Sequence, residues 1–489
     1  MTAWSGLALL LLVAAGIVFT GLPAFMVLIA VASLGALAGL ATDTVPYSLL
    51  TALPGRLINL LENDLLQALP LYVLMGLLLD RLPIARALFR SGLAVLPPSP
   101  SAPLVSGMGL GALLGPMNGS VGASVLALSR VVAPRLAERG VPPPLRYAAV
   151  AVASTLGVVI PPSLVLILLG DAMLNAHTIA VTTTGRTDRV INTQDVFHGA
   201  LGPAAISLVL TLVVAWLVGR RVHPEARQAQ APRETLRAGE AITAAVALVA
   251  LVVLLGGVAT GYFYAVEAAA MGATSLLLIG FLSGQLPGGV LRQVLADAMA
   301  TTGALFALLI AATTLTLVLR LLGTDQLVGG WIVALPGSEI AVVAVVLAVI
   351  GLCAFVLDAF EIIFVIVPIV IPPLLVRVAD ARWVASLVLL TLQTSFLLPP
   401  FGYALMMIRG TLKEAVPTGA LVRALVPFLV AQWTVLGLVL FAPQLTHLGE
   451  KAGEASRAPA RPLSKEDLDR RIEELLPPPP DIPAPDLKH

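Results

Sequence analysis

The stretch Gly115-Pro-Met-Asn-Gly-Ser120 interrupts an apolar run over Leu104–Leu128, and its Asn118 lies 43 residues before the pair Pro161-Pro162. A second apolar run is interrupted near Asp358, which lies 41 residues before Pro399-Pro400. Each proline pair breaks an apolar helix, because proline lacks an N–H group and its ring clashes with the preceding turn. The chain therefore shows one pattern twice: a turn inside an apolar segment, followed by a broken helix.

The composition of the chain is that of a membrane protein. Of its 489 residues, 58% are hydrophobic and 12% are charged, and the formal net charge is +1. Soluble proteins have about 45–50% apolar and about 25% charged residues, so an ordinary cytosolic enzyme and a nucleic-acid-binding protein are excluded. Apolar blocks near the length of about 20 residues that a spanning helix needs recur along the chain. We predict an all-α polytopic membrane protein with no cleaved signal peptide.

Lysine and arginine residues indicate the orientation of the predicted spans. Basic residues gather in alternate connections and in the central linker Arg220–Arg237, which the positive-inside rule places in the cytoplasm. This assignment holds only if residues 104–135 enter and leave the membrane from the inside and residues 338–378 from the outside. Both segments are therefore predicted to be re-entrant helical hairpins of opposite orientation.

The duplicated pattern and the opposite orientations predict two inverted-topology repeats, the arrangement typical of secondary transporters. The first repeat covers residues 1–219, with its hairpin at 104–135 and its broken helix at 147–172. The second covers residues 238–443, with its hairpin at 338–378 and its broken helix at 383–408. Residues 220–237 form a basic cytoplasmic linker. Residues 444–489 form a proline-rich, charged tail that we expect to be partly disordered.

The helix breaks indicate where an ion or a substrate binds. An unpaired backbone group in lipid costs several kcal/mol, so a break persists only where it meets protein, water, an ion or a substrate. Half-helix N-termini suit a carboxylate, and carbonyl and hydroxyl oxygens suit sodium. Ordinary kinks satisfied by neighbouring helices are the alternative. The candidate oxygen donors are Asn118, Ser120, Ser124, Ser154, Thr155, Ser163, Asp358, Gln393, Thr394 and Ser395.

Other polar residues allow more than one interpretation. Asp358 and Glu361 lie in a long uncharged stretch, and intramembrane carboxylates are usually functional. Glu267 opens an apolar helix and suits either a partner contact or a helix-start acid. His177 and His198 flank a polar insert, Asn175–Phe197, which we place outside the membrane as a solvated loop.

Several motifs resemble one transporter family over about residues 1–443. They are Ala68-Leu-Pro-Leu-Tyr-Val-Leu-Met-Gly76, Gly115-Pro-Met-Asn-Gly-Ser120, Ser154-Thr-Leu-Gly-Val-Val-Ile-Pro-Pro-Ser163, Ala265-Val-Glu-Ala-Ala-Ala-Met-Gly-Ala273 and Leu398-Pro-Pro-Phe-Gly402. With them the chain resembles the large, DctM-like membrane subunit of tripartite ATP-independent periplasmic (TRAP) transporters, within the ion-transporter superfamily. Asn118 stands where the family often has serine. Leu398 stands where the family often has threonine, so this chain lacks that hydroxyl, and Asp358 is the side chain that would complete the second sodium site.

The resemblance implies a function and partners. The chain would be the permease subunit of a bacterial inner-membrane transporter that imports a small organic acid with sodium by an elevator motion. Its partners would be a separate small four-helix membrane subunit (DctQ-like), a periplasmic substrate-binding protein and the lipid bilayer, with no nucleic acid and no cofactor besides the coupling sodium ions. A stand-alone sodium- or proton-coupled organic-anion carrier is the alternative. No catalytic or nucleotide-binding motif is present in the sequence, so we do not expect an enzyme.

The family's sodium sites lie between each hairpin tip and its broken helix. By resemblance we assign sodium to Gly115, Asn118, Ser120, Thr155, Gly157, Pro161, Leu357, Asp358, Thr394 and Leu397. By the same reasoning we assign the substrate to Asn118, Ser120, Ser163, Asp358, Pro400 and Gly402. The substrate, the sodium stoichiometry and the oligomeric state do not follow from the sequence.

Overall fold

A computed structural model describes residues 2–43, 51, 53–62, 64–186, 189–222, 236–399, 402–411 and 414–448. Contacts within the chain define one compact unit, Met1–Arg186 with Val190–Gly449. The second unit comprises Thr187–Arg189 and Glu450–His489, of which only Arg189 is described. The predicted tail therefore lies outside the described residues from residue 449 onward, as does the predicted linker over residues 223–235.

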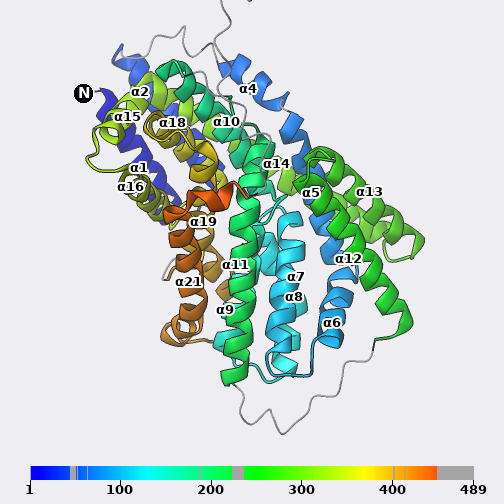
Figure 1. Ribbon diagram of the computed structural model, residues 1–489. Helices are drawn as coiled ribbons and strands as arrows, with labels where there is room; N and C mark the ends of the chain where they lie inside the picture. The colour runs from blue at the N-terminus through cyan, green and yellow to red at the C-terminus, as the bar shows by residue number, and fades with distance from the viewer. Residues whose placement is uncertain are drawn as a thin grey trace, which may run out of the picture. The chain divides into compact units, whose positions relative to one another are not determined.

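The described part of the first half is helical throughout, with short connections (Figure 1). Its elements are α1 (Thr2–Thr20), α2 (Ala24–Ala41), α4 (Leu53–Leu61), α5 (Asp64–Arg81), α6 (Ile84–Val95), α7 (Ala102–Leu114), the 3-10 turn η1 (Gly115–Met117), α8 (Val121–Glu138), α9 (Pro143–Val159), α10 (Leu164–Thr184) and α11 (Thr193–Val222).

The second half is also helical. It begins with α12 (Ala238–Ala259), α13 (Ala265–Leu282), α14 (Gly288–Leu321) and α15 (Thr324–Ala334). A broken segment follows: α16 (Glu339–Cys353), α17 (Ala359–Glu361), the π-helical turn η3 (Ile362–Ile366) and α18 (Val367–Arg377). The half ends with α19 (Ala381–Ser395), α20 (Tyr403–Thr411), α21 (Thr418–Phe441) and the 3-10 turn η4 (Pro443–Thr446).

Eight helices among the described residues are long and apolar enough to cross a membrane, or up to nine if a bent pair forms one span. The bent pair is α5 with α6, which meet at 62°. Pro143–Thr184, which contains the first helix break, is the most enclosed of these segments, with 94% of its apolar window buried. The prediction of an all-α polytopic membrane protein is confirmed.

Each of the two predicted hairpins packs against one half of each broken helix. α7 and α8 contact each other and the first half of the first broken helix (α9), and α8 also contacts the second half of the other broken helix (α20). In the same manner α16 and α18 contact each other, α16 contacts α19, and α18 contacts α10. Each hairpin is thus held by one half of each broken helix, which is the packing that a two-fold repeat would produce. The repeat boundaries stay predictions.

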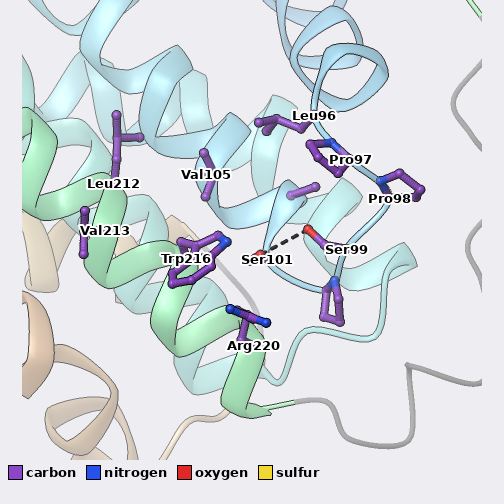
Figure 2. Close-up of a pocket in the computed structure, with 12 residues that line it drawn as sticks. Leu96, Pro97, Pro98, Ser99, Ser101, Val105, Leu212, Val213, Trp216 and Arg220 are labelled. Atoms are coloured by element: carbon purple, nitrogen blue, oxygen red, sulfur yellow. Dashed lines mark hydrogen bonds between the residues drawn. The ribbon is translucent and has the colours of Figure 1, made fainter.

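One end of α11 carries the residues expected at a membrane surface. Arg220 lies over the Trp216 ring, 4.4 Å from its centroid, beside the proline-rich connection between α6 and α7 (Figure 2). This connection and α11 together line a cavity of about 550 Å³. Beside the cavity the two elements are in contact, since a Cβ on Gly219 would lie 2.5 Å from Ser101 Cα. Tryptophan and arginine at the end of a span are typical of the membrane–water interface.

Two predicted boundaries are wrong. The first broken helix does not end near residue 172, because α10 continues to Thr184, with threonine hydroxyls bonded to carbonyls of the preceding turn. The predicted loop Asn175–Phe197 therefore contains nearly three turns of helix at its start and the first turn of α11 at its end. Arg220 and Arg221 belong to α11 rather than to a linker.

Candidate functional site

Glycines bring the first hairpin tip into backbone contact with the first helix break. Gly115 opens the tip and Gly157 lies in the last turn of α9. A Cβ atom on Gly157 would lie 2.2 Å from the Gly115 carbonyl carbon, and one on Gly76 of α5 would lie 2.9 Å from Asn118 Cα. Any larger residue would overlap backbone atoms, so the tip, the break and α5 pack as one unit.

Four helix ends meet where this tip and break touch. α7 and α9 end there, and α8 and α10 begin there, each with a serine N-cap. Ser120 Oγ accepts a hydrogen bond from Ala123 N, and Ser163 Oγ accepts one from Leu166 N, both at 3.1 Å. Helix C-termini carry partial negative charge and N-termini partial positive charge, so the same place offers oxygens to a cation and N–H groups to an anion.

A small cavity of about 10 Å³ lies between these helix ends. Its size is near that of one water molecule or one ion. Pro161 has no N–H group, so the Gly157 carbonyl lacks its usual partner four residues on, whereas the Val158 carbonyl accepts from Ser163 Oγ at 3.2 Å. The polar side chains that line the cavity are Ser120, Ser124, Ser154 and Ser163.

The second hairpin tip presents two carboxylates. Asp358 precedes α17, and the Glu361 carboxylate accepts a hydrogen bond from Asp358 N at 2.5 Å. Glu361 is 7% exposed. No lysine or arginine forms an ion pair with either carboxylate among the described residues.

Both hairpin tips line one cavity of about 580 Å³. Asn118 and Ser120 line it from the first tip, Asp358 and Glu361 from the second, and Tyr403 from the start of α20. Asn118 is 8% exposed, and its amide Nδ2 donates to Ser124 Oγ at 3.2 Å. A cavity of this volume is large enough for a small organic molecule.

The structure brings some of the predicted site residues together and not others. Gly115, Ser120, Gly157 and Ser163 surround the small cavity, and Asn118, Ser120 and Asp358 line the shared one. Leu357 lines a neighbouring cavity with Tyr403. Thr155, Thr394 and Leu397 are buried, and the hydroxyls of Thr155 and Thr394 donate to helical carbonyls. Neither these three residues nor Pro161 and Gly402 line any of the three cavities. Pro400 lies outside the described residues.

The sequence interpretation missed several residues of the shared cavity. Tyr403 follows the second break directly, so its position after Pro399-Pro400 was the signal that could have placed it. Asp80, Arg81, Arg130 and Asp297 also line the cavity. Arg81 and Arg130 entered the sequence interpretation only as markers of the cytoplasmic side, because nothing in the sequence shows that α5, α8 and α14 meet.

The sequence of the chain was compared with known protein families. Residues 10–445 match the model of the family described as tripartite ATP-independent periplasmic transporter, DctM component. The chain belongs to this family. The resemblance found in the motifs is therefore confirmed, and the DctM-family protein described here is a multi-pass membrane protein of a transporter family.

Related DctM-family proteins carry several substrate names. The chain is 23% identical to the C4-dicarboxylate TRAP transporter large permease protein DctM of Rhodobacter capsulatus, over 83% of this chain and 89% of that protein. It is 25% identical to the ectoine/5-hydroxyectoine TRAP transporter large permease protein UehC of Ruegeria pomeroyi, over 68% and 73%. It is 23% identical to the sialic acid TRAP transporter permease protein SiaT of Haemophilus influenzae, over 82% of this chain and 62% of that longer protein.

Solved transporter structures share the fold. The YdaH transporter of Alcanivorax borkumensis, whose topology is described as unusual, superposes with a TM-score of 0.61 over 80% of this chain and 87% of that chain, at 15% identity. MtrF of Neisseria gonorrhoeae superposes with a TM-score of 0.52 over 80% and 84%, at 14% identity. At these identities the comparison shows the fold alone.

We expect Tyr403→Phe to weaken apparent substrate affinity while the protein still folds. The Tyr403 ring packs on Phe396, with ring centroids 6.1 Å apart. The Tyr403 hydroxyl lies next to the start of α8, 2.9 Å from the position that a Cβ atom on Gly122 would take. Losing one hydrogen bond costs about 0.5–1.5 kcal/mol, so the half-saturating concentration in an uptake assay should rise several-fold. Tyr72→Phe is the matched control, because the buried Tyr72 hydroxyl has no hydrogen-bond partner among the described residues and Tyr72 is not part of this cavity's lining. An equal loss of apparent affinity in Tyr72→Phe would contradict the prediction.

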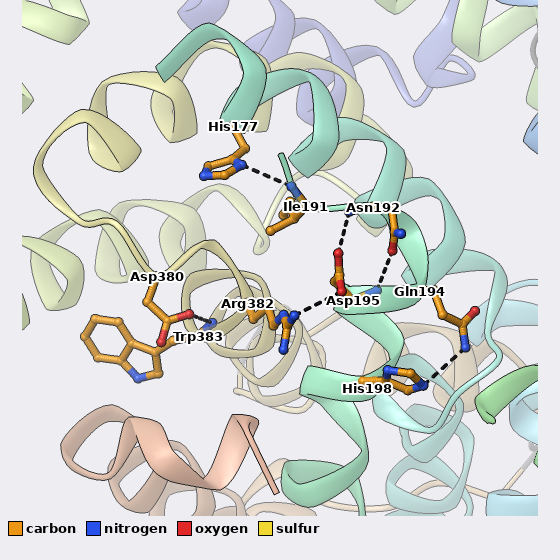
Figure 3. Close-up of polar contacts among 9 residues, drawn as sticks. All are labelled: His177, Ile191, Asn192, Gln194, Asp195, His198, Asp380, Arg382 and Trp383. Atoms are coloured by element: carbon orange, nitrogen blue, oxygen red, sulfur yellow. Dashed lines mark hydrogen bonds and ion pairs between the residues drawn. The ribbon is translucent and has the colours of Figure 1, made fainter. Parts of the chain in front are cut away.

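A polar corner joins α11 to α19 at the far end from Arg220 (Figure 3). Asp195 Oδ2 accepts from Asn192 N at 2.8 Å, and Asn192 Oδ1 accepts from Asp195 N at 2.8 Å, so the two residues cap the start of α11. Arg382 donates to Asp195 Oδ1 at 3.0 Å. His177 is 3% exposed and its Nδ1 accepts from Ile191 N, so the expectation of a solvated histidine in this segment is wrong for His177.

Arg382→Met is expected to lower the melting temperature of the purified protein. Asp195 is 6% exposed, so the substitution removes a buried ion pair between α11 and α19, and breaking such a pair typically costs about 3–5 kcal/mol. Arg135→Met is the control, because the Arg135–Glu138 pair is exposed and worth at most about 1 kcal/mol. Equal melting temperatures for the two variants would refute a structural role for the corner.

Proposed function

We propose that this chain is the large permease subunit of a binding-protein-dependent secondary transporter that imports a small organic acid together with sodium. The observation that carries the proposal is the shared cavity, in which the tips of two hairpins from different halves of the chain meet. A channel would need an open path through the protein, whereas a cavity that ends at two re-entrant tips suits alternating access.

Sodium coupling is supported by the donor set at the tips. The first tip offers serine hydroxyls and the carbonyl of Gly157 next to a cavity of ionic size. The second tip offers the carboxylate of Asp358. Oxygen donors of this kind suit a hard cation, and the serine-capped N-termini of α8 and α10 suit the carboxylate of an organic acid.

An elevator motion is supported by the exchange of half-helices between the hairpins. α7, α8, α9 and α20 pack together, as do α16, α18, α19 and α10, so the hairpins and broken helices suit movement as one body. We propose α2, α5, α13 and α14, which pack against one another, as part of the support. A separate DctQ-like subunit, a periplasmic binding protein and a location in the bacterial inner membrane complete the proposal, as the names of the TRAP relatives suggest.

Reconstitution tests the proposal. The chain, the small subunit and the binding protein encoded beside it would be placed in proteoliposomes, and labelled organic acids would be screened under an inward sodium gradient. We expect uptake that is lost without sodium and lost without the binding protein. Uptake that persists without the binding protein would instead establish a stand-alone carrier, and uptake that follows only a proton gradient would exclude sodium coupling.

A further inference from the structure

Acidic groups outnumber basic groups in the shared cavity. Its lining holds the carboxylates of Asp80, Asp297, Asp358 and Glu361 and the guanidinium groups of Arg81 and Arg130. Arg130 Nη1 lies 2.5 Å from Asp80 Oδ2, and Arg81 Nη2 lies 3.4 Å from Asp297 Oδ2. Both basic residues are therefore paired, and Asp358 and Glu361 remain without a basic partner in the described part of the chain.

Glu361 is the more enclosed of these two carboxylates. It is 7% exposed, and its carboxylate accepts a hydrogen bond from Asp358 N. Keeping a buried carboxylate charged is costly unless it is paired, and a cationic group placed beside Glu361 would offset that cost. A sodium ion at Asp358, as proposed above, would neutralise one carboxylate and leave the other.

The first tip supplies the opposite polarity across the same cavity. α8, a helix of 18 residues, begins at Ser120, and Gly119, Ser120 and Ala123 line the cavity at its N-terminus. The partial positive charge of a helix N-terminus favours an anionic group. The cavity is therefore positive at the first tip and negative at the second.

We infer that the substrate is a zwitterion, a small organic acid that carries an ammonium, amidinium or guanidinium group besides its carboxylate. The carboxylate would lie at the N-terminus of α8 and the cationic group at Glu361. The inference rests on the proposed function and specifies its substrate class. A dicarboxylate in this cavity would place a second negative charge against Glu361, and like charges at short range in a site of low dielectric repel strongly.

Thermal stability of the purified chain in sodium buffer tests the inference without any transport assay. The probes are β-alanine, 4-aminobutyrate and 4-guanidinobutyrate, set against propionate, butyrate and succinate. We expect at least one zwitterion to raise the melting temperature at a concentration about 10-fold lower than its nitrogen-free counterpart. Glu361→Gln should remove this preference, and Glu339→Gln should keep it, because Glu339 is exposed at the start of α16 and is not part of the cavity lining.

Three results would overturn the inference. The first is stabilisation by propionate, butyrate or succinate at concentrations as low as those of the zwitterions. The second is no stabilisation by any zwitterion, and the third is a zwitterion preference that survives in Glu361→Gln. The proposed function is tested separately, because sodium-driven, binding-protein-dependent uptake of an acid without a nitrogen group would support that function and still overturn this inference.

Discussion

Replacing Asp358 with alanine is expected to abolish sodium-driven uptake while the protein still folds. Asp358 lies at the second hairpin tip, in the cavity that both tips line, and its side chain has no basic partner among the described residues. Leu398 brings no hydroxyl to the second break, so this carboxylate is the charged oxygen donor that the proposal assigns to the second sodium ion. We expect the initial rate to fall at least about 100-fold, which corresponds to about 2.7 kcal/mol.

Asp325→Ala is the matched control for this experiment. Asp325 lies in the first turn of α15, where its carboxylate accepts from Gln326 N, and it is not part of the lining of the shared cavity. We expect its uptake rate to stay within about two-fold of the wild type, since such sites rarely contribute more than about 0.5 kcal/mol. Sodium-driven uptake at the normal rate in Asp358→Ala would remove Asp358 from the coupling mechanism.

Gly157→Ala should separate the first hairpin tip from the first break and stop transport. The new Cβ would lie 2.2 Å from the carbonyl carbon of Gly115 and 2.5 Å from its oxygen, and both atoms are backbone. Overpacking of this kind costs about 1–3 kcal/mol, and the tip has to move to relieve it. We expect a lower melting temperature and uptake near the background level, because the small cavity loses the geometry of its carbonyl and serine oxygens.

Gly109→Ala, in α7 of the same hairpin, shows whether the effect comes from this contact. A Cβ atom on Gly109 would meet no heavy atom within 4 Å. Alanine favours a helix over glycine by about 1 kcal/mol, so this variant should be as stable as the wild type or more stable, with normal uptake. Normal uptake by Gly157→Ala would show that the tip and the break need not touch.

The sequence predicted the positions of the first turn and the first helix break better than the contacts between halves. The turn at Asn118 and the break at Pro161 could be predicted from the sequence, because proline and glycine inside an apolar run interrupt a membrane helix and leave backbone groups that must be satisfied within the protein. The hydroxyls of Ser120 and Ser163 could be assigned as donors for the same reason. Tyr403 and Glu361 were not assigned to the site, since their roles depend on α20 lying beside α8 and on which face of the second hairpin meets the cavity.

Helix ends and exposure were the least predictable features. α10 extends twelve residues beyond the predicted end at residue 172, although threonine is a weak helix former; the threonine hydroxyls donate to carbonyls of the preceding turn. His177 was expected to be solvated and is buried, since the connection around Ile191 folds back against α10. Tertiary packing of this kind leaves no pattern in a single sequence.

Sodium-dependent stability of the purified chain tests the central claim most directly, because it needs neither substrate nor partner subunits. The melting temperature would be measured as sodium replaces potassium at constant ionic strength. A ligand at ten times its Kd stabilises the folded state by about 1.4 kcal/mol, so we predict a rise in the wild type that is smaller in Asp358→Ala and in Ser120→Ala and unchanged in Asp325→Ala. An equal melting temperature in sodium and potassium, or a sodium-dependent rise that both tip variants retain in full, would contradict a sodium site at the hairpin tips.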